Sequence, residues 1–352
     1  MTDMCYNIWA AFGHNTQFGH AERQKTDQKE GRSMNSFVLK GQICTSGTMD
    51  RIEITENGFL VVEDGLVRGV FSALPSRFSA LPLRDCGDCL VLPGMTDLHI
   101  HAPQFAFRGL GMDMELLEWL NTYTFPEESK YQDLEYAHRA YASFTEHLLR
   151  STTTRAAVFA TIHVPATLHL MELLENSGLR TYVGKVNMNR NCPVYLREIS
   201  KNQAVRDTAA WLEAAQKFER TKPILTPRFI PSCTDDLMYA LSGLRRQYDV
   251  PVQSHLSENF SEIAWVQELC PRSKCYGDAY RQFGLFGGDH RCIMAHCVHW
   301  RAGAGDDEGK RRVHRAFAGI EHESFLRRRA GQQVPGERPQ GRPRHRRGGR
   351  QP

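Results

Sequence analysis

The sequence predicts an α/β protein, an incomplete TIM-like (β/α)8 barrel that follows a small N-terminal β domain. Two observations carry this prediction. From residue 89 to about residue 299, apolar runs alternate with amphipathic stretches, which is typical of parallel strands joined by crossover helices. Before residue 89, short β-rich runs are separated by Gly, Asn and Asp, which is typical of antiparallel hairpins.

The barrel is predicted over residues 91–300, where six strand units are visible. The predicted strands are LVLPGMTDLHIH, TTTRAAVFAT, RTYVGKVNM, PILTPRFI, VPVQSHLSE and RCIMAHC. Helical stretches between them include LEYAHRAYASFTEHLLRS and VRDTAAWLEAAQKFERT. Six units exceed what a small open sheet needs, but a closed barrel of this kind has eight.

The small β domain is predicted over residues 34–90, from the runs FVLKGQICT and IEITENGFLVVEDGLVRGVF. Residues 1–33 are polar and without a period, so we expect a flexible extension. Ten scattered cysteines indicate reduced thiols, and no secretory signal is recognisable, so we expect a cytoplasmic protein. No apolar run approaches the roughly 20 residues that span a bilayer, so we expect no membrane partner.

Residues 301–352 form a distinct Arg/Gly/Pro-rich tail that we expect to be disordered. The tail carries a net charge of +8, whereas the preceding 300 residues carry −4. We interpret it as the product of a shifted reading frame, because GC-rich DNA read out of frame encodes these residues. The alternative is a basic RNA-binding tail. No aromatic residue follows Phe325 to stack on bases, so we expect no nucleic-acid partner.

The strongest local motif is His99-Ile100-His101, at the end of the first predicted barrel strand. Alternate residues of a strand share a face, so both imidazoles point the same way and could bind one metal ion. The spacing alone is weak evidence. Its position at the carboxyl end of a strand, where barrel active sites are built, strengthens it.

Further candidates close the fifth and sixth predicted strands. His255 is followed three residues later by Glu258, as in hydrolytic sites where a carboxylate moves protons beside a metal. The alternative is a helix-start histidine with a carboxylate near the helix dipole. His296 closes the sixth strand, where a single histidine is more often a core residue. Four histidines at strand ends together favour a metal site.

The motif order resembles the amidohydrolase superfamily, and within it the guanine deaminases. The stretches that carry the resemblance are HIHAPQFAFRG, LLEWLNTYTFPEE, FATIH, VGKVNMN, TPRFIPSC and QSHLSEN. The resemblance covers about 200 residues and implies one Zn2+ per chain, held by His99, His101 and His255. It implies that Glu258 shuttles the proton and that His296 orients the metal-bound hydroxide.

The same resemblance implies that Gln104, Arg228 and Phe229, next to His255, hold guanine or a related purine. An Arg fork reads acceptor atoms and a Gln amide supplies both a donor and an acceptor. The alternative is that Arg228 makes an ion pair and Phe229 is core. A fourth strand ending in Arg-Phe rather than lysine favours one metal over a two-metal site bridged by a carboxylated lysine. The resemblance also implies a homodimer.

The family pattern also has an aspartate after strand eight and further strands that complete the small β domain. Downstream of His299 the only aspartates are Asp306 and Asp307, which follow no apolar strand, and neither is assigned. We therefore expect conversion of guanine and water to xanthine and ammonia, impaired or absent in this chain. The alternatives are another heterocycle (a triazine, pterin or cytosine), a non-catalytic fragment, or an RNA binder.

Overall fold

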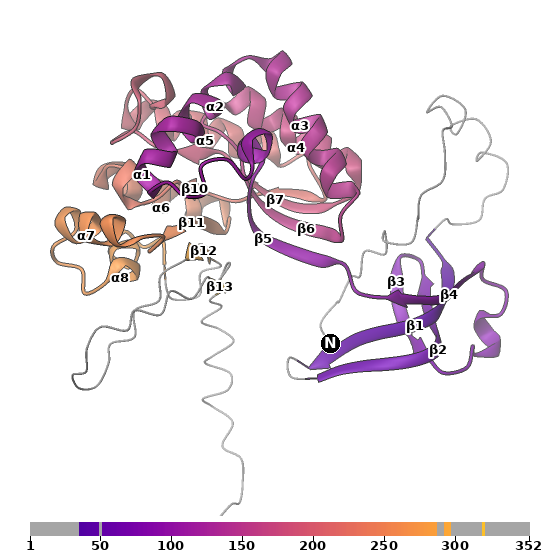
Figure 1. Ribbon diagram of the computed structural model, residues 1–352. Coiled ribbons are helices and arrows are strands. Elements are labelled where there is room, and N and C mark those ends of the chain that lie inside the picture. The colour runs from indigo at the N-terminus through magenta and orange to yellow at the C-terminus, as the bar shows by residue number, and fades with distance from the viewer. Residues whose placement is uncertain (1–34, 49–50, 287–291, 297–318, 321–352) are drawn as a thin grey trace, which may run out of the picture.

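The computed structural model describes residues 35–48, 51–286, 292–296 and 319–320 (Figure 1). A small sheet comes first in the chain, and a larger body of strands and helices follows. Within these residues, no helix combines the length and the apolar character needed to cross a membrane. The predicted extension of residues 1–33 lies outside the described residues.

The small sheet has four strands in the order β3-β2-β1-β4. Their bounds are Phe37–Thr48 (β1), Arg51–Glu63 (β2), Leu66–Phe71 (β3) and Leu83–Val91 (β4). The predicted antiparallel hairpins are confirmed, since β2 pairs antiparallel with both β1 and β3. Asp64 and Gly65 join β2 to β3 with φ angles of 53° and 76°, the left-handed pair that a two-residue hairpin turn requires.

The fourth strand of this sheet departs from the hairpin pattern. β4 runs parallel to β1, with Val38 opposite Leu83. The predicted strand LVLPGMTDLHIH is therefore divided: its first residues end β4 at Val91, and β5 begins at Met95. Pro93 lies in the break because it has no N–H to donate to a strand ladder. The boundary between the two domains at residues 90 and 91 stays a prediction.

The larger body contains six parallel barrel strands in chain order, among the described residues. Their bounds are Met95–His101 (β5), Thr153–Phe159 (β6), Arg180–Gly184 with Val186–Asn187 (β7, β8), Thr221–Pro223 with Thr226–Pro227 (β9, β10), Val252–Leu256 (β11) and Cys292–His296 (β12). β5, β6, β7 and β9 pair in parallel, as do β8 with β10 and β11 with β12. A bridge between Leu225 and Val252 joins the fourth strand to the fifth. The predicted incomplete barrel is confirmed.

Helices pack outside these strands, as the alternating pattern predicts (Figure 1). Their bounds are Leu134–Leu149 (α3), Val164–Ser177 (α4), Lys201–Ala215 (α5), Asp235–Tyr248 (α6), Phe260–Leu269 (α7) and Tyr276–Gln282 (α8). α5 begins four residues before the predicted stretch because Ser200 caps it, its side chain accepting from the N–H of Gln203. The large side chains of Tyr141, Leu170 and Trp211 are fully buried in the shared core.

Between β5 and α3 the chain forms short helical turns instead of a single helix. Ala102–Phe107 is a 3-10 turn, Leu116–Trp119 is α1, Leu120–Thr124 is a π turn and Phe125–Ser129 is α2. Another 3-10 turn, Ile230–Ser232, follows the fourth barrel strand. These turns lie next to the carboxyl ends of the strands, where the site residues gather.

The predicted tail falls almost wholly outside the described residues. The exception is Gly319–Ile320, which forms β13 and pairs antiparallel with Ile293 and Met294 of β12. The prediction that residues 301–352 form a disordered tail stays a prediction, since these two residues are the only part of it that the structure describes. A ladder partner at a sheet edge needs only backbone N–H and C=O groups, so no apolar pattern marked it.

Candidate metal centre

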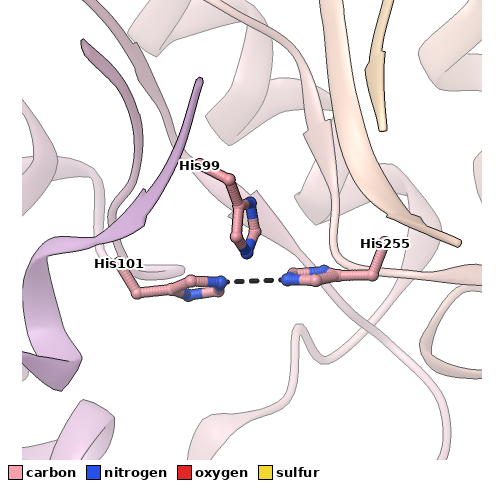
Figure 2. A group of neighbouring side chains, drawn as sticks. All are labelled: His99, His101 and His255. Atoms are coloured by element: carbon pink, nitrogen blue, oxygen red, sulfur yellow. Dashed lines mark hydrogen bonds between the residues drawn. The ribbon is translucent and has the colours of Figure 1, made fainter. Parts of the chain in front are cut away.

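Three imidazoles converge at the carboxyl ends of β5 and β11 (Figure 2). His99 and His101 extend from β5, and His255 from β11. One ring nitrogen from each lies within 4.8 Å of the others, so the three could hold a metal ion. The Nε2 atoms of His101 and His255 are 2.9 Å apart. Side chains alternate between the two faces of a strand, and this predicts that His99 and His101 point to the same side. The sequence pattern therefore explains the placement of two of the three imidazoles.

The protonation of these rings suits a metal ligand. His255 Nδ1 lies 2.7 Å from the carbonyl oxygen of Arg228, which can only accept, so Nδ1 carries the proton and Nε2 keeps its lone pair. Burial lowers the pKa of His99 and of His255 to about 3, and that of His101 well below its ordinary value. Neutral imidazoles with facing lone pairs are the form that transition metals bind.

Phe159, at the end of β6, packs against all three rings, with its centroid 4.6 Å from that of His255. Its ring stacks on His101 with centroids 4.4 Å apart and meets the edge of His99 at 5.0 Å. The side chain of Phe159 is fully buried. An apolar floor of this kind excludes water from one side of the imidazoles and fixes their rotamers, which preorganises the site.

A cavity of about 120 Å³ lies beside the imidazoles. All seven predicted site residues whose side chains are described line it: His99, His101, Gln104, Arg228, Phe229, His255 and Glu258. Its remaining walls are Leu116, Trp119 and Leu120, from α1 and the π turn that follows. The lining therefore combines four apolar side chains with six convergent polar ones.

Glu258 stands on a sharp turn after β11. The chain leaves the strand through Ser257, whose φ of 55° is in the left-handed region that favours glycine. Glu262 holds the turn, because its carboxylate accepts from the N–H of Glu258 at 2.6 Å and from the N–H of Asn259 at 3.4 Å. Burial raises the pKa of Glu258 to about 7, against the opposing charge of Arg228. A carboxyl with such a pKa both accepts and releases protons near neutrality.

Arg228 makes the ion pair that the sequence left open as an alternative, and its predicted contact with a purine stays a prediction. Its Nη1 donates to Glu128 Oε2 at 2.6 Å, and its side chain also lines the cavity. Phe229 is buried, 4% exposed, yet reaches the cavity as well. Phe229 can therefore belong to the core and line the cavity at the same time, since core residues surround the cavity.

The fourth predicted histidine is placed only by its backbone. His296 ends β12 opposite Leu256, one residue beyond His255. Its side chain lies outside the described residues, as do Asp306 and Asp307. The role assigned to His296 therefore stays a prediction.

Sequence reasoning missed several residues of the site. Leu116, Trp119 and Leu120 line the cavity, and Glu128 pairs with Arg228. All four belong to the stretch LLEWLNTYTFPEE, in which no residue was assigned a role. A buried acid such as Glu128 gave a signal, since a carboxylate flanked by Phe125 and Tyr131 needs a charged partner. Glu262 was missed because its partners are backbone N–H groups and the hydroxyl of Tyr276, 14 residues later, and no sequence spacing marks them.

Known proteins resemble this chain in sequence and in fold. The model of the Amidohydrolase family matches residues 90–330. A guanine deaminase of Dictyostelium discoideum is 36% identical over 284 residues, which are 74% of this chain and 62% of the relative. This chain thus spans less than two thirds of that relative's length.

Solved structures show the same likeness. A guanine deaminase from C. acetobutylicum with bound guanine is 43% identical, with a TM-score of 0.73 over 76% of this chain and 64% of that one. A triazine hydrolase from Arthrobacter aurescens has a TM-score of 0.64 over 76% of this chain and 61% of its own length, but at 16% identity it shows the fold alone. The family model covers more than half of the chain, and the chain belongs to the amidohydrolase family.

Proposed function

We propose that this protein is a guanine deaminase, which hydrolyses guanine to xanthine and ammonia. The observation that carries the proposal is one cavity lined by three neutral imidazoles, a proton-exchanging carboxyl and the groups that fit a purine. Relatives that are named guanine deaminases, at 36% and 43% identity, support this substrate. The low-identity likeness to triazine hydrolases supports only the fold.

The substrate would lie against three side chains of the cavity. Arg228 donates only, so it suits the acceptor atoms of a purine, and the Gln104 amide both donates and accepts. Phe229 offers an aromatic ring on which a planar base can stack. His255 lies where the metal and the substrate would meet.

The proposed metal is one Zn2+, held by His99, His101 and His255. Three imidazoles are a ligand set typical of catalytic zinc, and one ring nitrogen of each lies close enough to the others to share an ion. When bound, zinc supplies an activated water as the nucleophile at neutral pH. No lysine or second cluster of ligands lies at this centre among the described residues, which favours a single ion.

Glu258 is the proposed proton shuttle of the reaction. Its carboxyl lines the cavity with a pKa raised to about 7, so it can take a proton from the attacking water. It then protonates a ring nitrogen next to the amino-bearing carbon, so that ammonia can leave. His296 is proposed to orient the nucleophile from the end of β12.

The test is release of ammonia from guanine by the purified 352-residue chain, with zinc measured in the same preparation. We expect guanine turnover to be impaired in this chain, and whatever turnover remains to disappear in Glu258→Gln, which keeps the shape but cannot exchange the proton. A substrate panel of a triazine, a pterin and cytosine separates the alternative activities within the fold. Zinc-loaded protein that releases ammonia from another member of the panel, and none from guanine, would refute the proposal.

Three further proposals concern the protein as a whole. We propose a cytoplasmic location, a homodimer, and a division at residues 34–90 and 91–300. Seven cysteines in the described part of the chain are free thiols, which supports a reducing compartment. Analytical ultracentrifugation at micromolar concentration distinguishes a dimer from a 40.1 kDa monomer.

A further inference from the structure

A buried ion pair joins the wall of the cavity to a helix 100 residues earlier in the chain. Arg228 and Glu128 are 3% and 1% exposed at their side chains, and their charged atoms are 2.6 Å apart. Burial of two charges is costly, and the attraction between them offsets that cost only in good geometry. The pair therefore fixes the guanidinium in one position.

Two residues of α2 contact the guanidinium of Arg228. Glu128 supplies the carboxylate, and the ring of Phe125 lies 5.2 Å from Arg228 Cζ, within cation–π range. Both are residues of one short helix, so one element fixes the position of the Arg228 guanidinium. Arg228 thereby has little freedom to rotate.

Arg228 also contacts the metal centre through its backbone. Its carbonyl oxygen accepts from His255 Nδ1 at 2.7 Å, and its side chain lines the same cavity as His255. A shift of Arg228 would therefore alter the position of the substrate relative to the metal ligands. Displacements of about 1 Å cost catalysis on the order of 100-fold.

The pair also sets the charge of the cavity. An unpaired guanidinium in an apolar pocket attracts anions, whereas a guanidinium neutralised by a carboxylate is suited to a neutral ligand that offers a hydrogen-bond acceptor. Glu128 binds Nη1, and the other N–H groups of the fork remain donors. The carbonyl oxygen of guanine is a neutral acceptor of this kind.

We propose that Glu128 is a positioning residue for substrate specificity, which aims the guanidinium of Arg228 at the carbonyl oxygen of a 6-oxopurine. The inference rests on the proposed function, and it deepens that function by naming the group that selects the base. Glu128 itself does not line the cavity. It acts through Arg228.

The experiment compares guanine with 2-aminopurine, which has the same amino-bearing carbon but lacks the carbonyl oxygen. In Glu128→Gln we expect kcat/KM for guanine to fall at least about 10-fold and that for 2-aminopurine to change less than about 3-fold. If Glu128 had a merely structural role, kcat/KM would fall equally for both substrates. Equal losses, or no loss for guanine, would overturn the proposal.

Glu127→Gln is the matched control. Glu127 lies on the same helix, is 8% exposed and pairs with Lys130 at 2.6 Å instead of a cavity residue. We expect this variant to keep the guanine preference of the wild type. Loss of preference in Glu127→Gln as well would show that the helix as a whole, and not the Glu128 carboxylate, is responsible.

A second set of variants covers misfolding of Glu128→Gln, which leaves a buried charge unpaired. Arg228→Met is compared with the double variant Glu128→Met, Arg228→Met, which contains neither charge and is often tolerated. A carboxyl left alone can become neutral by taking up a proton, which a guanidinium left alone cannot do, so Arg228→Met is the less disruptive single variant. If Glu128 acts only through Arg228, the two have the same ratio of kcat/KM for guanine and 2-aminopurine. A ratio that differs between them more than about 3-fold would contradict the proposal.

The position of Arg228 can be read without any turnover. A wild-type chain that neither deaminates nor binds either purine would refute the proposed function. Crystal structures of the wild type and Glu128→Gln would then still decide the positioning role. We expect the guanidinium to leave its place beside Phe125 in the variant, and an unmoved guanidinium would overturn the inference.

Discussion

The chemistry of the three imidazoles is decided by burial, residue by residue. The carbonyl of Arg228 holds the proton of His255 on Nδ1, and the surrounding protein disfavours the charged form of all three rings. A metal ion is the partner that satisfies three facing lone pairs at once. The prediction that follows concerns His255, which has the most completely defined hydrogen bonding.

In His255→Ala we expect zinc affinity to fall more than about 100-fold, because a direct ligand contributes more than the 10–100-fold typical of its outer partners. Competition with a chromophoric chelator measures this affinity. His169→Ala is the control: His169 pairs with His138 at 2.9 Å, away from the cavity. An equal loss of affinity in both variants would show that surface histidines, not the centre, hold the zinc.

Glu262 gives a prediction for the pH dependence of stability. Burial, and then the charge of Glu258, raises the pKa of Glu262 to about 7. A carboxyl with a raised folded pKa favours folding below its unfolded pKa, and this stability is lost as pH rises toward 7. The buried imidazoles act in the opposite direction, so the effect of Glu262 appears only as a difference between variants.

We expect Glu262→Gln to gain stability relative to the wild type between pH 4.5 and 7, by on the order of 2–3 kcal/mol. Urea unfolding of metal-free protein measures it, since bound metal would add its own pH dependence. Glu268→Gln, at an exposed position of the same helix, is the control for replacing a carboxylate with an amide. A constant difference for Glu262→Gln would contradict the argument.

At the scale of the elements, the site depends on how closely the barrel strands approach. Gly184 ends β7, and a Cβ at this position would lie 1.7 Å from Thr226 Oγ1 and 2.6 Å from Gln253 Nε2. The atoms that it would meet belong to the fourth and fifth strands, whose ends include Arg228 and His255. Only hydrogen fits between these strands.

We therefore expect Gly184→Ala to destabilise the protein by about 3 kcal/mol, at the upper end of overpacking costs. Gly243→Ala is the matched control, since Gly243 lies in α6 with no atom within 4 Å of its added Cβ. Alanine there should stabilise the helix by up to about 1 kcal/mol. Thermal unfolding compares the two, and opposite signs are the expected result.

Much of the element pattern could be predicted from the sequence because it depends on local periodicity. Apolar strands alternate with amphipathic helices, and the period of two places His99 and His101 on one face. The parallel pairing of β4 with β1 could not be predicted from the sequence, because a strand's partner and direction depend on tertiary contacts.

Some residues at the cavity could likewise be predicted from the sequence, and others could not. Gln104, Arg228 and Phe229 follow barrel strands directly, so their positions at the strand ends indicate the site. Glu128 reaches Arg228 across 100 residues, and no spacing in the sequence connects them. The turns from Leu116 to Ser129 have no single period, because they pass through α, π and α conformations in succession.

At the scale of the whole molecule, the metal centre connects strands that are not neighbours. His99 and His101 belong to the first barrel strand and His255 to the fifth, with three strands between them in the pairing order. A bound ion would join β5 to β11 across the carboxyl ends of the sheet. The small sheet of β1 to β4 provides no residue to this centre.

Zinc binding should therefore stabilise both strands together and leave the small sheet unchanged. At a zinc concentration 100 times its dissociation constant, the stabilisation is about 2.7 kcal/mol, which corresponds to about 100-fold slower hydrogen exchange wherever opening releases the ion. Exchange measured by mass spectrometry reads β5, β11 and the small sheet in one experiment. The decisive comparison is His255→Ala, in which the zinc-dependent protection of β5 should disappear although the substitution is on β11. Protection of β5 that persists in this variant would mean that the two strands are not joined through one ion.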